Sequence, residues 1–185
     1  MAPSYRVLLV CWEEDAERIR KRCRSLVGFI REFWKVLEPK RELKIGWALE
    51  AMAEHLEAVT EGRIKRLLMT VPPGMMKSLL LVFWTAWEWG PQGRADLQVL
   101  ATSFSQANVL RDNMKLRRLV ESEKFQAVWP LPLRGDQNAK AKFENEENGF
   151  SEARPFGSMT GGRGDRVHDL AVGHREVTDR AVGVD

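Results

Sequence analysis

The sequence predicts a single α/β domain. Two apolar runs with the length of a buried strand are each followed by a helical segment, residues 66–71 by 79–87 and residues 97–103 by 105–120. The chain has 185 residues, of which 44% are hydrophobic and 30% are charged. A chain of this size and composition is large enough for one domain with an apolar core and leaves little room for a second.

The N-terminal part of the chain is predicted to be helical. Residues 13–37 place apolar side chains three and four positions apart between charged ones, and Pro39 closes this segment. A second amphipathic helix is predicted over residues 45–59, and Gly62 ends it. We expect residues 1–62 to form a helical segment that packs over the edge of the sheet.

After the helix at 79–87, a loop rich in glycine and proline leads to the strand at 97–103. Ser105 is the expected N-cap of the next helix. This helix carries four basic residues, Arg111, Lys115, Arg117 and Arg118. A solvated helix face is the simpler explanation of these charges, and a surface that contacts DNA or a neighbouring subunit is the alternative.

The C-terminal third has fewer regular patterns. Residues 125–145 are predicted to form a loop, and residues 142–144 and 149–153 a hairpin around a turn rich in asparagine. The glycines of residues 157–165 predict a mobile loop that approaches a ligand or another backbone closely.

The segment between the first predicted strand and its helix has the chemistry of a phosphate cradle. It reads Val-Pro-Pro-Gly-Met-Met-Lys-Ser over residues 71–78. In a P-loop, successive backbone N–H groups point at the phosphates and the following helix adds the positive end of its dipole. Lys77 would then reach the β- and γ-phosphates, and the hydroxyl of Ser78 would bind a magnesium ion.

Two observations bear on this interpretation in opposite directions. Val71 and Met76 stand where the pattern GxxxxGK[ST] has its two glycines, so an ordinary Pro-Pro-Gly turn is the alternative. However, a lysine in the first turn of an otherwise apolar helix opposes the helix dipole, and an anionic ligand would explain Lys77. Gly74 also leaves one position free to adopt a positive φ.

The bulk properties exclude few classes of function. The 29 basic and 26 acidic residues give a net charge of +3, which permits binding to a polyanion without demanding it. Cys11 and Cys23 have neither metal-site spacing nor a disulfide framework, so a reducing cytoplasm is the expected compartment. No apolar run approaches the ~20 residues of a spanning helix, so we expect no membrane association.

Together, the segments from Phe29 to Val167 resemble the ATPase domain of phage terminase large subunits, the motors that package DNA into procapsids. The resemblance is carried by residues 29–34, Trp47, His55-Leu56, 71–79, 84–91, 101–105, Arg111, Arg117 and 160–164. In that family a Walker A loop of the form Pro-Pro-x-x-x-Lys-Ser is usual. The missing glycines are therefore no objection to a P-loop.

The resemblance implies a RecA-like P-loop NTPase core in residues 63–167. Such a core has three layers, with a mainly parallel sheet flanked by helices, and here it would be incomplete at the C-terminus. ATP and Mg²⁺ are the implied cofactors, and hydrolysis would drive the movement of double-stranded DNA in the cytoplasm of a bacterial host. The implied partners are the terminase small subunit, the portal protein and further copies of the chain.

The resemblance also implies the site residues. Those that would bind the nucleotide are Pro73, Gly74, Met75, Met76, Lys77, Ser78 and Leu79. Lys77 would stabilise charge on the transferring phosphoryl group, and Ser78 would hold Mg²⁺ between the β- and γ-phosphates. Arg163 is the candidate for the arginine that completes such sites, and Asp169 is the nearest candidate for a magnesium-linked acid.

The family pattern breaks after Val167. Terminases continue there with an apolar strand that ends in paired acids, whereas Asp169 has no adjacent carboxylate. We expect residues 168–185 to be a divergent tail, as in a frameshifted or truncated reading frame, and no general base can be assigned. The function stays open between an ATPase motor fragment and a non-catalytic remnant, which would be a nucleotide- or subunit-binding module. A related helicase would need motifs that this chain is too short to contain.

Overall fold

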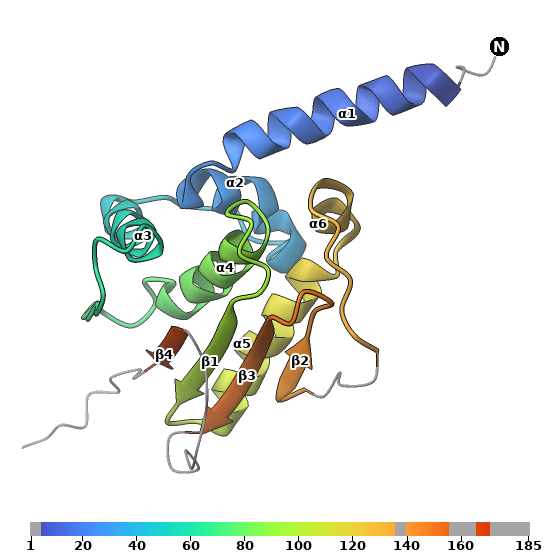
Figure 1. Ribbon diagram of the computed structural model, residues 1–185. Helices are drawn as coiled ribbons and strands as arrows, with labels where there is room; N and C mark the ends of the chain where they lie inside the picture. The colour runs from blue at the N-terminus through green and yellow to red at the C-terminus, as the bar shows by residue number, and fades with distance from the viewer. Residues whose placement is uncertain (1–4, 136–139, 156–165, 171–185) are drawn as a thin grey trace, which may run out of the picture.

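The computed structural model describes residues 5–135, 140–155 and 166–170, with side chains from Glu14 to Pro155 within these ranges (Figure 1). The described part of the chain contains six helices and four short strands. The helices are α1 (Tyr5–Arg22), α2 (Leu26–Leu37), α3 (Trp47–Thr60), α4 (Lys77–Trp89), α5 (Gln106–Val120) and α6 (Glu123–Val128). The strands are β1 (Gln98–Ser103), β2 (Lys142–Glu144), β3 (Phe150–Pro155) and β4 (Arg166–Leu170).

The strands form one small mixed sheet in the order β2-β3-β1-β4. Strand β1 is central and runs parallel to both neighbours, with Gln98 opposite Phe150 of β3 and Val99 opposite Arg166 of β4. Strand β2 is antiparallel to β3. Helix α5 packs on β1 and β3, and the other helices pack mainly on α4, α5 and one another.

The predicted RecA-like core, with three layers and a mainly parallel sheet, is wrong. The structure is a helix-rich domain with a small mixed sheet. Helices α4 and α5 lie on the same face of that sheet, because residues of both helices bound one small cavity against Val99 and Ser151. The described residues therefore form an α-rich domain rather than a sheet with a helical layer on each face.

The strand predicted at residues 66–71 is also absent. Residues 66–71 are not among the four strands of the described sheet, in which β3 and β4 flank β1. The segment is extended nevertheless, because Leu67 and Met69 pack against the core while the intervening Leu68 is 91% exposed. The alternation of apolar contact and exposure is strand-like, but the backbone pairing that defines a strand is missing.

The helix predicted over residues 13–37 is divided at Ser25. The Ser25 side chain accepts a hydrogen bond from the backbone N–H of Gly28 at 3.1 Å and caps α2. The chain turns tightly here, since a Cβ at Gly28 would lie 1.9 Å from the carbonyl oxygen of Arg22. Helix α1 therefore ends at Arg22 and projects from the rest of the molecule (Figure 1).

Two further predictions on the C-terminal third have different outcomes. The hairpin is confirmed, since β2 pairs with β3 and the side chain of Asn145 accepts hydrogen bonds from the N–H groups of Glu147 and Gly149 in the turn. The loop predicted from residue 125 is wrong at its start, because Ser122 caps the short helix α6. The predicted glycine-rich loop lies outside the described residues.

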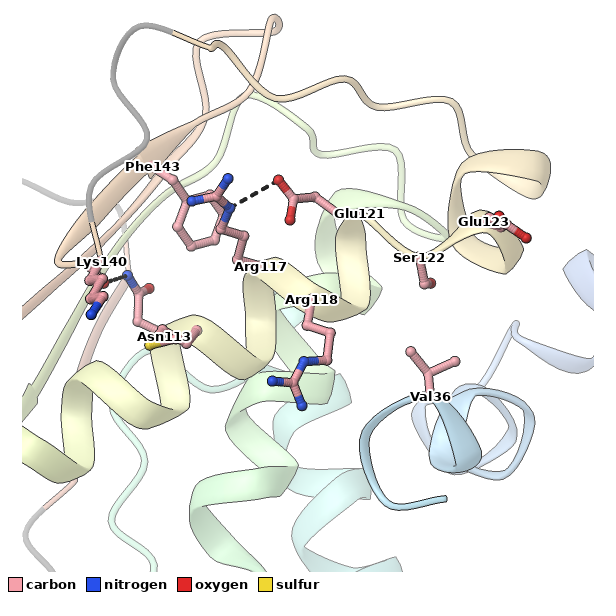
Figure 2. Close-up of a pocket in the computed structure, with 10 residues that line it drawn as sticks. Val36, Asn113, Arg117, Arg118, Glu121, Ser122, Glu123, Lys140 and Phe143 are labelled. Atoms are coloured by element: carbon pink, nitrogen blue, oxygen red, sulfur yellow. Dashed lines mark hydrogen bonds and ion pairs between the residues drawn. The ribbon is translucent and has the colours of Figure 1, made fainter. Parts of the chain in front are cut away.

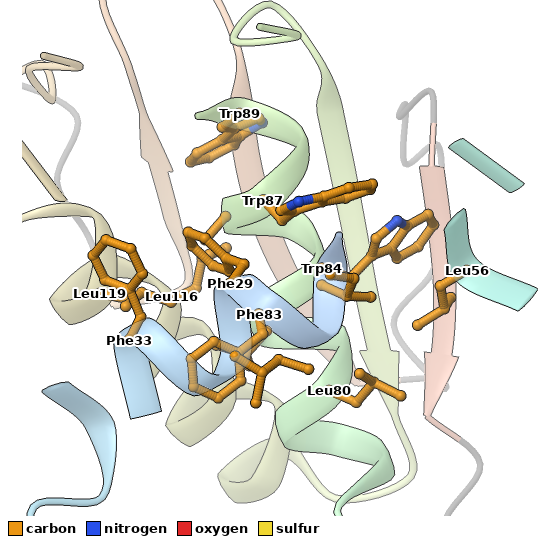
Figure 3. Close-up of a cluster of buried hydrophobic side chains, with 14 of the residues drawn as sticks. Phe29, Phe33, Leu56, Leu80, Phe83, Trp84, Trp87, Trp89, Leu116 and Leu119 are labelled. Atoms are coloured by element: carbon orange, nitrogen blue, oxygen red, sulfur yellow. The ribbon is translucent and has the colours of Figure 1, made fainter. Parts of the chain in front are cut away.

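The core is built from aromatic side chains that hold α2 against α4 (Figure 3). The rings of Phe29 and Phe33 stack at 4.7 Å, and Phe29 meets Phe83 of α4 edge to face at 6.3 Å. Such pairs contribute ~0.5–1.5 kcal/mol each beyond their buried area.

Among the described helices, none combines the length and the apolar character that crossing a bilayer requires.

Candidate phosphate-binding site

The predicted phosphate cradle lies at the N-terminal end of α4. Gly74 has a φ of 89° and Met76 a φ of 57°, so two left-handed residues turn the chain into the helix. The helix begins at Lys77, and no side chain caps this end. The first N–H groups of a helix have no acceptor within the helix, and helix N-terminal ends are therefore common anion-binding sites.

The orientation of α4 places this end near the carboxyl edge of the sheet. The indole N–H of Trp89, in the last turn of α4, donates to the carbonyl oxygen of Leu97 at 3.0 Å. The C-terminal end of α4 is thereby fixed at the start of β1. The helix then runs back along the sheet, so its N-terminal end points toward the edge where the parallel strands β1, β3 and β4 end (Figure 1).

The loop lines a cavity of about 420 Å³. This volume falls within the ~300–1,000 Å³ of small-molecule sites. All seven predicted nucleotide-binding residues, Pro73 to Leu79, line it together with Val71 and Pro72. The remaining lining residues come from distant segments: Glu38 and Arg41 after α2, and Arg111, Asp112 and Lys115 on α5. Three parts of the chain thus converge on the predicted loop.

The cavity has an excess of positive charge. It is lined by Arg41, Lys77, Arg111 and Lys115 against the two carboxylates of Glu38 and Asp112. Lys115 Nζ lies 2.7 Å from Glu38 Oε1, and Arg111 Nε lies 3.0 Å from Asp112 Oδ1. The hydrogen bond from Lys115 holds the pKa of Glu38 below its ordinary value. Both acids are therefore held by cations, and the net charge of the lining favours an anion.

A phosphate ester fits this combination of groups. An uncapped helix end supplies N–H donors and a positive dipole, and the surrounding lysine and arginine side chains supply charge-assisted hydrogen bonds. Magnesium at nucleotide sites takes one or two protein ligands together with phosphate oxygens. The hydroxyl of Ser78 and the carboxylate of Asp112 line the same cavity and are suited to that role.

No cluster that could hold a metal by itself occurs among the described residues, where no group of three or more His, Cys, Asp or Glu side chains comes together.

Two of the predicted catalytic residues are not brought to this cavity by the described structure. Arg163 lies outside the described residues. Asp169 occupies the next-to-last position of β4, opposite Thr102 of β1. Its backbone is therefore near the carboxyl edge of the sheet, toward which the N-terminal end of α4 points. Its side chain is outside the description, and its role as a magnesium-linked acid stays a prediction.

Sequence reasoning named Arg111 and Lys115 only as a solvated face or a surface for DNA or a subunit, and it missed Glu38, Arg41 and Asp112. Asp112 had a detectable signal, since it stands on the apolar face of α5 between Val109 and Leu116 and is 7% exposed. An acid on the buried face of a helix needs a partner, and this marks it as a functional candidate. Glu38 and Arg41 lie in a loop with no periodic pattern, so no sequence feature indicated them.

A second cavity, of about 580 Å³, lies on the other part of α5 (Figure 2). Its lining mixes Arg117, Arg118 and Lys140 with Glu121 and Glu123, and Arg117 Nε is paired with Glu121 Oε1 at 2.9 Å. Neither an uncapped helix end nor a left-handed turn opens into it. The larger cavity therefore lacks the features that make the first one a candidate phosphate site.

Comparisons with known proteins do not assign the chain to a group. No protein-family model, no curated protein and no solved structure matches it. The resemblance to terminases therefore rests on the sequence segments that carry it, and the function has to be argued from the site.

Proposed function

We propose that this chain binds the triphosphate of ATP, with Mg²⁺, at the loop of residues 72–79, as the ATP-binding portion of a DNA-packaging motor of the terminase large-subunit type. One observation carries the proposal. The uncapped end of α4 and all eight residues of the loop line a single cavity that has four basic side chains and two carboxylates.

Each group has a defined part in binding. The N–H groups at the start of α4 and the charge of Lys77 meet the phosphate oxygens, and Ser78 with Asp112 supplies protein ligands for magnesium. Arg111 and Lys115 are at present paired with acids, so an incoming phosphate would compete with Asp112 and Glu38 for them. ATP binding would therefore rearrange the ion pairs that Arg111 and Lys115 of α5 make.

The motor role is supported by the sequence resemblance alone. It would place the protein in the cytoplasm of a bacterial host, with double-stranded DNA, the terminase small subunit, the portal protein and further copies of the chain as partners. Nucleotide binding is the part of the proposal that the geometry supports.

Binding of a fluorescent ATP analogue with Mg²⁺ tests the proposal. Charge-assisted hydrogen bonds contribute ~1.5–3 kcal/mol, so Lys77→Ala should weaken binding by about 10- to 100-fold. Lys65→Ala is the matched control, because Lys65 is exposed and does not line the cavity. Equal binding by the wild type and both variants would contradict the proposal.

A non-hydrolysing nucleotide-binding module is the second candidate. The observation in its favour is that both carboxylates of the cavity, Glu38 and Asp112, are already held by cations. A general base must be within hydrogen-bond reach of the attacking water with its acceptor available. Phosphate release recorded on the same samples separates the two functions: release that depends on Lys77 supports the motor, and binding without release supports the module.

A further inference from the structure

A dense basic tract crosses the junction of α1 and α2. Residues 18–24 read Arg-Ile-Arg-Lys-Arg-Cys-Arg, with five basic residues in seven. Basic side chains are favourable in the last turn of a helix, which accounts for Arg20, Lys21 and Arg22 at the end of α1. The helix dipole does not account for Arg24, which follows the helix, or for the density of charge.

All five basic side chains of this tract are exposed. Arg18 is paired with Asp15 at 2.6 Å, and Arg22 with Glu32 at 3.5 Å, in ion pairs whose arginines are more than half exposed. Such surface pairs are weak and exchange readily for another anion. Within the described ranges, Lys21 and Arg24 have no ion-pair partner. The cations of the tract are therefore accessible for binding to a negatively charged partner.

Part of this tract lines a cavity of about 430 Å³, distinct from the phosphate site on α4. Arg20, Lys21 and Arg24 supply three cations against the single acid Glu17. The opposite wall comes from Pro91 and Gln92 after α4 and from Trp129 after α6. The guanidinium of Arg20 is held toward α6 by its hydrogen bond to the carbonyl oxygen of Val128 at 3.0 Å. The basic cavity therefore has a fixed wall, and Lys21 and Arg24 have no ion-pair partner among the side chains that the structure describes.

We propose that this basic junction, defined as residues 18–24 with the cavity beside them, binds the phosphodiester backbone of duplex DNA. Four of its five cations are arginines, and a planar guanidinium group can donate two parallel hydrogen bonds to the oxygens of one phosphate. Duplex DNA presents one negative charge per ~1.7 Å of its axis, so several cations in a short tract can each meet a phosphate. A folded protein surface rarely offers anionic charge at that density.

The arrangement of the cations favours DNA over an anionic membrane. Successive residues of a helix are rotated by ~100°, so Arg18, Lys21 and Arg22 lie on one side of α1 and Arg20 on the other. A flat membrane surface would contact one side only, whereas the phosphate rows of a duplex flank a groove and can contact both. The inference deepens the proposed function and rests on it only for the choice of DNA as the polyanion.

The test is the salt dependence of binding to a labelled duplex of about three helical turns, measured by fluorescence anisotropy without nucleotide. Each phosphate contact contributes ~0.9 to the slope of log K against log salt. Lys21→Gln/Arg24→Gln should therefore reduce the slope by about 1.8 and weaken binding by at least about tenfold at ~0.1 M salt. Lys65→Gln/Arg66→Gln, which removes two exposed cations elsewhere, is the matched control and should bind like the wild type.

Three outcomes would overturn the inference. They are an unchanged slope in the Lys21/Arg24 variant, an equal loss in the Lys65/Arg66 control, and binding to phosphatidylserine vesicles with none to the duplex. Both variants replace exposed side chains, and thermal unfolding of each confirms that it folds. Since no nucleotide is present, failure of this test leaves ATP binding at α4 unaffected, and failure of ATP binding leaves this test intact.

Discussion

The two ends of helix α4 are built in opposite ways. Its C-terminal half is fixed: Trp84, Trp87 and Trp89 are buried, and the indole N–H of Trp87 donates to the carbonyl oxygen of Cys23 at 2.8 Å (Figure 3). Its N-terminal end has no cap, follows a left-handed Met76 and opens into a charged cavity. The same helix thus anchors the core at one end and presents backbone donors at the other.

Within α4, we therefore expect the C-terminal half to determine the stability of the fold and the N-terminal end to determine ligand binding. Changes at the tryptophan end should unfold the protein, and changes at the loop end should alter binding while leaving the fold in place. Each prediction below tests one side of that division.

The largest effect is expected from Trp87→Ala. Removing a buried tryptophan leaves a cavity and costs ~3–5 kcal/mol of the free energy of unfolding. Chemical denaturation measures this loss. The control is Met75→Ala at the loop end, where the side chain is 43% exposed and the change should stay within about 0.5 kcal/mol. Similar losses in both variants would contradict the division between the two ends.

A smaller loss is expected from Thr60→Val, which removes a hydroxyl that links α3 to α4. Thr60 Oγ1 accepts a hydrogen bond from the indole N–H of Trp84 at 2.8 Å and donates to Glu88 Oε1 at 2.7 Å. Valine keeps the shape and removes both bonds, so the free energy of unfolding should fall by ~1–3 kcal/mol. Thr70→Val, at an exposed site before the loop, should be neutral in the same denaturation experiment.

The smallest change in stability is expected from Glu38→Gln at the loop end. The hydrogen bond from Lys115 lowers the pKa of Glu38 in the folded protein from 4.5, so the carboxylate stabilises the fold above pH 4.5 and loses this effect as the pH falls through the lowered pKa. Glu38→Gln should therefore cost ~1 kcal/mol at pH 7 and nothing in acid. Denaturation at both pH values measures the difference.

The same substitution should have the opposite effect on binding. Removing the carboxylate frees Lys115 and raises the positive charge of the cavity, so the affinity for a fluorescent ATP analogue should rise while stability falls. A parallel fall in both would show that Glu38 only supports the fold.

The sequence predicted the helices better than the sheet. The apolar periodicity at 45–59, 79–87 and 105–120 is local, and α3, α4 and α5 confirm it within a few residues. A strand needs a partner that the local pattern does not contain. Residues 66–71 have a strand-like pattern but pair with no strand in the described part of the chain, whereas 97–103 lies between β3 and β4.

The candidate site was likewise predicted only in part, because a local sequence pattern does not show which distant segments pack together. Lys77 and Ser78 follow from a contiguous motif, and the structure places both in one cavity with the rest of the loop. Glu38, Arg41 and Asp112 come from distant segments that only the packing of α2, α4 and α5 brings together. The structure does not describe the side chains of Arg163 and Asp169, so the roles assigned to these two residues stay predictions.

The most direct test of the phosphate site is a titration of the ¹⁵N-labelled protein with Mg²⁺ and ATP, followed by the chemical shifts of the backbone amides. The account predicts that the largest shifts belong to Gly74 through Leu79, and that the amides of Trp84 through Trp89 change little. Inorganic tripolyphosphate should reproduce the pattern, because the proposal assigns the contacts to the phosphates. Absence of shifts in the loop, or larger shifts at the tryptophan end of α4, would contradict it.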